Sequence, residues 1–361
     1  MEIAVIGGGN GAYATAADLS EKGHNVRLWR RNIEAFRPVL ESKWINLKDY
    51  QGERKVKLAQ ASTDLGAVIR GAQLIIIPLP AISQESLSIE LAPHLQDNQV
   101  ILLCPGTFGS YLMASRLLDA GCNAKVIFAE TGTLPYLTRK HGDTIAITTR
   151  ATRLPTGVFP AEKSEAAFRI LKEAFPAVEP LQDALDGALM NAGPIIHPPL
   201  ILLNAGPIEH FDHWDIHNEG TQPAVRRVHD ALDAERIAVR EALGYGPPHF
   251  PLADHYSQEG DEWMYGNAAH EKLVDSADWR EKLVLKDHRY MNEDVACGLA
   301  LLVSIGEWAG VPVPLAAGLL AIASAIVGRD LRLTGRTFEY LGLARLTPQE
   351  VHQLLKRGLS S

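Results

Sequence analysis

One histidine, His197, lies inside an otherwise apolar run, NAGPIIHPPLILLN at residues 191–204. Pro194, Pro198 and Pro199 surround it, and proline interrupts the hydrogen bonding of a helix. An imidazole titrates near neutral pH, so in an apolar setting it can act as a general acid or base. The same pattern also fits a buried histidine that is hydrogen-bonded in a core, and the residue types alone leave both interpretations open.

A glycine turn near the N-terminus offers a second candidate site. Residues 2–31 read as an apolar run, a glycine-rich turn, an Ala-rich helical segment and a second apolar run, which predicts a β-α-β unit. Gly7, Gly9 and Ala12 match G-x-G-x-x-[GA] in that context, where glycine lets a pyrophosphate approach the backbone and the helix start binds the anion. The alternative is a glycine turn that binds nothing. We predict a dinucleotide site whose binding residues include Gly7, Gly9, Asn10, Gly11, Ala12 and Pro78.

The residues after the second strand indicate which dinucleotide binds. An acidic side chain there would bind the adenosine ribose of NAD, but this chain has Arg30 and Arg31. Two guanidinium groups can neutralise and bind a 2′-phosphate, so both are predicted cofactor-binding residues and NADP is favoured over NAD. The competing interpretation is that both arginines are only solvated.

Further apolar runs at 74–78, 100–104 and 125–129 alternate with helical segments, which predicts a parallel sheet covered by helices. Ligands bind at the carboxyl ends of such strands, so the turns at 78–80, 105–107 and 130–133 should line the site. Glu130 and Thr131 are accordingly predicted to bind substrate. Residues 145–149 and the stretch to about Val178 are expected to extend the sheet.

From about residue 183 the pattern changes to helical periodicity, with candidate helices at 185–204, 222–243, 294–309 and 314–327. The predicted fold class is α/β, with a Rossmann-type parallel-sheet domain at 1–182 followed by an all-α domain at 183–361. The uncharged segment 314–327 fits either a core helix or a homodimer interface.

Composition restricts the classes of partner. The 361 residues carry a formal net charge of −8 without a concentrated basic block, which argues against nucleic acid or an anionic membrane and favours small-molecule partners. Two uncharged stretches, 187–208 and 308–328, reach spanning length, but prolines interrupt both, and buried helices are expected. Three cysteines without CxxC spacing and an N-terminus without a basic leader favour the cytoplasm.

A cluster of possible ligands occurs at residues 208–219, IEHFDHWDIHNE. Its density of His, Asp and Glu is compatible with a metal, but the spacing is not diagnostic, and we predict no metal. A solvated loop and recognition of a polar or cationic amino-acid side chain are the other interpretations.

The chain resembles the opine dehydrogenase family, the octopine, nopaline and N-carboxyalkyl amino acid dehydrogenases. The resemblance covers nearly the whole chain and rests on these segments: GGGNG at 7–11, ETGTLPY at 130–136, NAGPIIHP at 191–198, LLNAG at 202–206, EGTQP at 219–223, DAERIAV at 233–239, RYMNED at 289–294, GVPVPL at 310–315 and GRTFEYLGL at 335–343.

The resemblance implies an NAD(P)H-dependent enzyme that reductively condenses an α-keto acid, such as pyruvate, with the amino group of an L-amino acid. It implies that His197 is the catalytic histidine, that Asp294 is its partner, and that Arg289 holds a substrate carboxylate. The chain departs from the family pattern at residues 296–301, ACGLAL, which puts substrate identity in question more than the reaction type.

Two other functions fit the same architecture. A β-hydroxyacid, glycerol-3-phosphate or ketopantoate-type dehydrogenase would use a lysine from the helical domain, and residues 187–208 contain none. A protein that senses NAD(P) without catalysis would not need the set of His197, Asp294 and Arg289.

Overall fold

The computed structural model describes residues 1–267, 269–276 and 279–359. The chain divides into two compact units: Met1–Ala188 together with the last residues from Leu355, and Leu189–Leu354. The expected division after residue 182 lies shortly before this one. The two units are described separately below.

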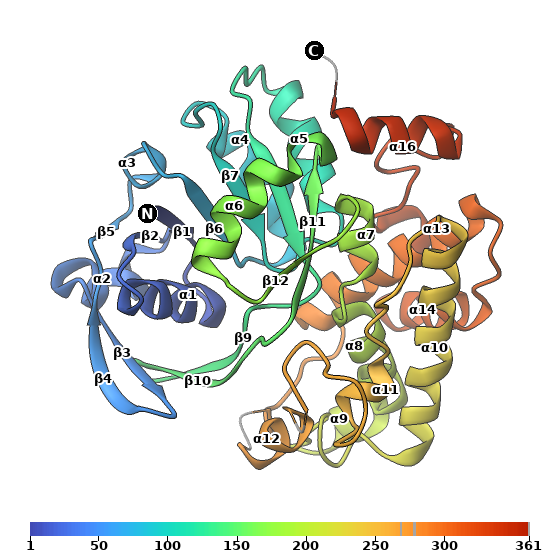
Figure 1. Cartoon of the computed structure of the whole chain (residues 1–361). Coiled ribbons are helices and arrows are strands. Elements are labelled where there is room, and N and C mark those ends of the chain that lie inside the picture. The colour runs from blue at the N-terminus through green and yellow to red at the C-terminus, as the bar shows by residue number, and fades with distance from the viewer. Residues whose placement is uncertain (268, 277–278, 360–361) are drawn as a thin grey trace. The chain divides into compact units, whose positions relative to one another are not determined.

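The first unit contains the predicted sheet, with strand order β12-β11-β8-β7-β6-β1-β2-β5 (Figure 1). All neighbouring strands pair in parallel except β11 and β8, which are antiparallel. The central strands are fully buried, as their continuous apolar runs predicted. The strands are β1 (Glu2–Ile6), β2 (Asn25–Trp29), β5 (Gln60–Ser62), β6 (Leu74–Ile77), β7 (Val100–Leu103), β8 (Ile127–Thr131), β11 (Leu154–Phe159) and β12 (Val178–Pro180).

Helices connect the strands of this sheet, and the Rossmann-type topology predicted from the sequence is confirmed. Helix α1 packs on β1 and β2, α5 packs on β8, and α6 packs on β11 and β12. The helices are α1 (Asn10–Glu21), α2 (Ile33–Ser42), α3 (Leu65–Ile69), α4 (Gln84–Leu91), α5 (Gly109–Asp119), α6 (Ser164–Ala174) and α7 (Ala184–Leu189), with short 3₁₀ turns at Ala81–Ser83 and Ala161–Lys163.

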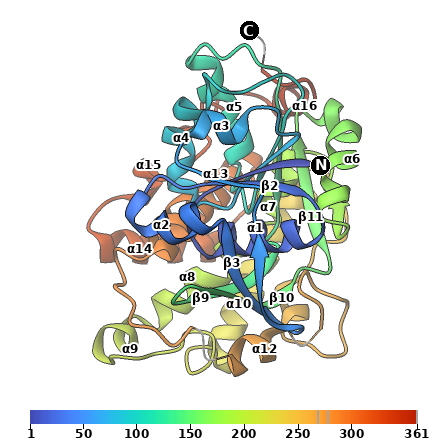
Figure 2. The ribbon, with the colours of Figure 1, turned by 90° about the vertical axis from the view of Figure 1, so that its left-hand side faces the viewer.

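A second sheet, of order β4-β3-β10-β9, lies against α1 (Figure 2). Its strands are β3 (Trp44–Asp49), β4 (Gly52–Lys57), β9 (Tyr136–His141) and β10 (Thr144–Arg150). The expectation that residues 145–149 extend the main sheet is therefore wrong, because β10 pairs with β3 and β9. The expected extension towards Val178 is present as β11 and β12.

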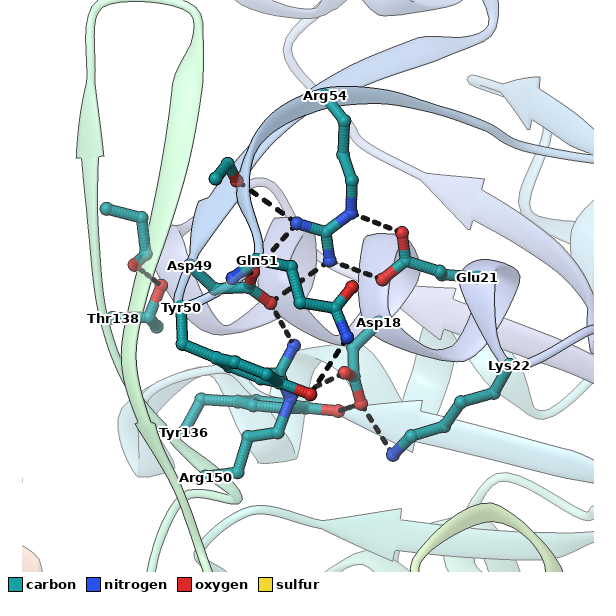
Figure 3. Close-up of polar contacts among 12 residues, drawn as sticks. Asp18, Glu21, Lys22, Asp49, Tyr50, Gln51, Arg54, Tyr136, Thr138 and Arg150 are labelled. Atoms are coloured by element: carbon teal, nitrogen blue, oxygen red, sulfur yellow. Dashed lines mark hydrogen bonds and ion pairs between the residues drawn. The ribbon is translucent and has the colours of Figure 1, made fainter.

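A network of charged and polar side chains joins the second sheet to α1 (Figure 3). Asp18 of α1 accepts hydrogen bonds from the Tyr136 hydroxyl at 2.9 Å and from Arg150 Nε at 2.8 Å. Arg150 also donates to Asp49 at 2.6 Å. Arg54 forms ion pairs both with Asp49 and with Glu21, the last residue of α1. Burial raises the pKa of the Tyr136 hydroxyl, so it remains a donor. The network fixes β9 and β10 on one helix of the dinucleotide fold.

The second unit is helical, as predicted. The expected helix at 185–204 is interrupted and continues as a separate helix from Gly193, and the expected helix at 294–309 begins as a π-helix. The elements are α8 (Gly193–Leu203), α9 (Ala205–His210), α10 (Pro223–Ala242), α11 (Leu252–His255), α12 (Ala269–Asp275), the π-helix η3 (Tyr290–Leu299), α13 (Ala300–Ala309), α14 (Pro314–Val327), α15 (Leu331–Thr334) and α16 (Pro348–Arg357), which runs past the end of this unit.

Helix α14 is the uncharged segment that the sequence left open as core or interface. It buries Ala316, Leu319, Leu320 and Ala323 along one face and packs on α8, α10, α13 and η3 of the same unit. It therefore serves at least as a core helix. Among the described residues, none of the helices combines the length and the apolar character needed to cross a bilayer.

Candidate functional site

The glycine turn of the first unit has the geometry of an anion cradle. Gly7 adopts φ +142°, which L side chains rarely adopt, and its N–H donates to Trp29 O at 2.9 Å. Gly9 is the N-cap of α1, and an added Cβ there would meet no described atom within 4 Å. Because Gly9 has no side chain and the first turn of α1 is uncharged, the N–H groups at this end have no capping side chain. These residues fit the pyrophosphate of a dinucleotide.

The two predicted arginines lie in different surroundings. The side chain of Arg30 folds over Gly8, where an added Cβ would overlap it, and its Nη1 contacts the Tyr13 hydroxyl at 3.3 Å. Arg31 instead pairs with Glu90 at 2.5 Å and is mostly exposed. Of the two, Arg30 is the one that the structure brings to the glycine turn.

The predicted rim residues lie in different surroundings, and Pro78 is the one with a contact to the glycine turn. Pro78 follows β6, and its Cβ would lie 3.2 Å from a Cβ added at Gly11. Glu130 and Thr131 are the last residues of β8 and are fully buried within the chain. Glu130 accepts a hydrogen bond from Ser110 at 2.7 Å, and its side chain packs against Gly106. Their predicted role in substrate binding stays a prediction.

The second unit brings His197 and Asp294 together although 97 positions separate them in the chain. His197 Nδ1 lies 2.9 Å from Asp294 Oδ2. Burial raises the pKa of Asp294 to about 7, while the positive charge of Arg289 acts in the opposite direction. A carboxyl group whose pKa lies near neutrality, beside an imidazole, is suited to general acid–base chemistry.

Two glycines allow the elements that carry this pair to approach. An added Cβ at Gly193 would overlap Asp294 Oδ1, so the start of α8 must be glycine for the carboxylate to lie there. An added Cβ at Gly298 would overlap the ring of Pro194. The close packing of α8 on η3 therefore depends on a missing side chain on each element. The π-helical winding of η3, a form often found at functional sites, presents Asp294 in this packing.

Aromatic side chains surround the imidazole. Tyr290 stacks on His197 with ring centroids 3.8 Å apart and an interplanar angle of 14°. Arg289 lies over the Tyr290 ring at 5.1 Å, so the predicted carboxylate-binding arginine and the histidine contact the same tyrosine. His217 approaches His197 edge to face at 6.0 Å. Sequence reasoning did not assign Tyr290 a role, although its place beside Arg289 was a signal.

A second histidine, His229 of α10, holds the backbone next to the first. It is fully buried, and burial lowers its pKa to about 4, so it is neutral at pH 7. Its Nε2 donates to Ile196 O at 3.0 Å, and the Tyr256 hydroxyl lies 3.3 Å from Nδ1. This assigns the proton to Nε2 and makes His229 a permanent donor to the carbonyl that precedes His197.

Some side chains of the cluster at 208–219 are buried and hydrogen-bonded within the chain, and others are exposed to solvent. Asp215 is buried and accepts from the N–H groups of His217 and Asn218, whereas the side chain of Asp212 is almost fully exposed. Glu219 pairs with Arg280 at 2.5 Å. Across the parts of the chain that the structure describes, no three His, Cys, Asp or Glu side chains are grouped to hold a metal ion.

Two family models match the chain, one in each half. Residues 180–327 match the family model "NAD/NADP octopine/nopaline dehydrogenase, alpha-helical domain", and residues 2–115 match "NAD-dependent glycerol-3-phosphate dehydrogenase N-terminus". The opine dehydrogenase of Arthrobacter sp. (strain 1C) is 27% identical over 350 residues, which are 95% of this chain and 96% of that protein.

Vitopine synthase of Allorhizobium ampelinum is 26% identical over 97% of this chain and 98% of its own length. The solved structure of an octopine dehydrogenase in complex with NADH and agmatine has the same fold, with a TM-score of 0.71 at 19% identity over 99% of this chain and 98% of that one. The matched helical domain contains His197 and Asp294, the pair described above. Residues 180–327 match the helical domain of the octopine/nopaline dehydrogenases, and the chain is similar to opine dehydrogenases along nearly its whole length.

Proposed function

We propose that the protein is an NAD(P)H-dependent opine dehydrogenase, which condenses an α-keto acid with the amino group of an amino acid and reduces the resulting imine. The observation that carries this proposal is the pair of His197 and Asp294, 2.9 Å apart in the unit that matches the octopine/nopaline dehydrogenase domain. The first unit would hold the dinucleotide and the second would supply the groups that act on the substrates.

His197 would move the protons of the condensation. Its Nδ1 faces Asp294, so Nε2 is the ring nitrogen that we assign to the substrates. As a base, Nε2 takes a proton from the attacking amine, and as an acid it gives one to the hydroxyl that leaves as water. Asp294 orients the ring and stabilises its charged form. When bound, the reduced nicotinamide supplies the hydride that converts the imine to a secondary amine.

Arg289 would bind a carboxylate, which every α-keto acid and amino acid carries. A guanidinium group can hold a carboxylate with two parallel hydrogen bonds, which fixes orientation as well as charge. Its contact with Tyr290, the ring that stacks on His197, supports a role close to the proton-transferring group.

We further propose that NADP is preferred over NAD. Arg30 supports this. It follows β2, where an NAD-binding protein would have a carboxylate for the ribose, and its side chain lies over the glycine turn. Comparing kcat/KM for NADPH and NADH tests the preference, and a higher value for NADH would overturn it. The cytoplasm remains our proposed location, since the three cysteines are free thiols, and a homodimer stays a prediction.

A two-substrate panel tests the main proposal. Pyruvate, glyoxylate and 2-oxoglutarate are each combined with every amino acid, and oxidation of NADPH or NADH is followed by absorbance. Opine chemistry requires both substrates, whereas oxidation with a carbonyl compound alone would indicate a β-hydroxyacid, glycerol-3-phosphate or ketopantoate-type enzyme. Binding of the dinucleotide without oxidation in any combination would indicate a sensor. His197→Gln should lower kcat by about 10²–10⁴-fold with dinucleotide binding retained.

A further inference from the structure

A second cation reaches the same tyrosine as Arg30. Lys140 of β9 places Nζ 4.5 Å from the centroid of the Tyr13 ring, whose hydroxyl contacts Arg30 Nη1 at 3.3 Å. Tyr13 is buried in the first turn of α1, and both cations are half-buried. The two positive charges come from the residue that follows β2 and from the second sheet, and they meet at Tyr13 beside the glycine turn.

No carboxylate among the described residues pairs directly with either of these charges. In the described portions of the chain, neither Arg30 nor Lys140 forms an ion pair with Asp or Glu, while Arg31 is paired with Glu90. Burial, and next to it the charge of Arg30, lowers the pKa of Lys140, and Asp143 acts more weakly in the opposite direction. Holding two like charges partly out of water is costly unless an anion binds them.

The position of Lys140 is built into the fold. Tyr136 and Lys140 are four residues apart on β9, so their side chains point to the same face of the strand. Tyr136 is hydrogen-bonded to Asp18 of α1, within the network that also contains Arg150 (Figure 3). The network therefore fixes the strand on α1 and holds Lys140 over Tyr13, on the same helix.

We propose that Arg30 and Lys140 together bind the 2′-phosphate of NADP(H), and that Arg31 lies outside this site. The end of β2 is where dinucleotide folds bind the 2′ position of the adenosine ribose, which distinguishes this anion from the pyrophosphate at the start of α1. The inference rests on the proposed use of NAD(P)H, and it replaces a pair of neighbouring arginines by one arginine and a lysine that is far away in the sequence.

The test is equilibrium binding of NADP⁺ and NAD⁺ by calorimetry, without keto acid or amino acid. Lys140→Gln should raise the Kd for NADP⁺ by about tenfold or more, because a charge-assisted contact to phosphate is lost. The Kd for NAD⁺ should change by less than about twofold. Lys140→Arg keeps the charge and should retain the preference for NADP⁺. Arg31→Gln is the matched control and should leave both Kd values unchanged.

Several results would overturn the inference. These are an unchanged Kd for NADP⁺ in Lys140→Gln, equal weakening of NADP⁺ and NAD⁺, a tenfold weakening of NADP⁺ in Arg31→Gln, or tighter binding of NAD⁺ than of NADP⁺ by the unaltered protein. Binding of 2′,5′-ADP against 5′-AMP, which differ only in the 2′-phosphate, repeats the comparison without the nicotinamide. Because no substrate is present, the inference can hold even if the panel finds no opine formation, and it can fail while opine formation is found.

Discussion

Replacing Asp294 by asparagine removes the charge that faces His197 and keeps the shape of the side chain. At the 2.9 Å between Nδ1 and Oδ2, a pair of unit charges attracts by about 6 kcal/mol at an effective dielectric constant of about 20. Raising the pKa of Asp294 from 3.8 to about 7 corresponds to a cost of about 4 kcal/mol for the buried carboxylate. The difference before rounding, about 1 kcal/mol, is what the ionised pair gains over a neutral one, and Asp294→Asn loses it.

This loss predicts a fall in kcat of at least about tenfold, since each 1.4 kcal/mol is about tenfold in rate. An asparagine NH₂ group facing Nδ1 would also favour the wrong tautomer of the ring, which adds to the loss. The assay is initial-rate opine formation with saturating substrates between pH 6 and pH 9. In the forming direction the pair must give up a proton, so kcat should fall as pH rises above about 7, and the fall should move to lower pH in the variant.

Stability separates this effect from damage to the fold. A carboxyl whose folded pKa is raised contributes stability that is fully present below 3.8 and is lost as pH rises to about 7. Asp294→Asn removes this loss, so at pH 8 its Tm should be no lower than that of the unaltered protein. The reasoning is refuted if the variant retains kcat within fivefold across the pH range, or if a double variant with His197→Gln is far slower than either single one.

Three further predictions concern the carboxylate, the packing and the network. Arg289→Lys should raise KM for a substrate carboxylate by about tenfold, because the two-point contact is lost, while the Kd for NADP⁺ stays the same; an unchanged KM contradicts the role. Gly298→Ala should cost about 1–3 kcal/mol in urea unfolding through overlap with Pro194, whereas Gly318→Ala, in open space on α14, should not destabilise. Hydrogen bonds from Arg54 lower the pKa of Asp49, so the stability that Asp49 contributes is present above pH 3.8 and is lost in acid. Asp49→Asn should therefore make the stability fall less between pH 5 and pH 2. A urea midpoint that falls as steeply with pH in the variant as in the unaltered protein would contradict this.

The main sheet could be predicted because its strands are continuous apolar runs. Residues such as 74–77 and 100–103 are buried on both faces, so nearly every position must be apolar, and the pattern is visible locally. The second sheet gave no such signal. β3 and β4 read WINLKD and GERKVK, mixed sequences of a half-exposed sheet, and β3 pairs with β10 through Asn46 and Thr144, which are far apart in the chain. Long-range pairing of this kind cannot be inferred from local periodicity.

The candidate site divides in the same way. His197 could be singled out because it is the one titratable residue in an apolar run, whereas Arg289 and Asp294 were named only through the resemblance to the opine dehydrogenases. In the sequence, Lys140 cannot be distinguished from an ordinary exposed lysine on a strand. Only the packing of β9 on α1 shows that it faces Tyr13. Arg31, by contrast, lies in the predicted place in the sequence, but a neighbouring carboxylate, Glu90, engages its charge.

The prolines around His197 have a physical reason in the packing of α8. Pro198 and Pro199 have no N–H to donate to the carbonyls four residues earlier, so the turn that carries His197 has fewer internal hydrogen bonds than an ordinary helix. Contacts from other elements support this turn: His229 donates to Ile196 O, and Pro194 packs into the space left by Gly298. The position of the imidazole therefore depends on residues of α10 and η3, which are distant from His197 in the sequence and contact α8. A change at these supporting residues should alter the His197–Asp294 distance, and with it the rate, without touching either reacting group.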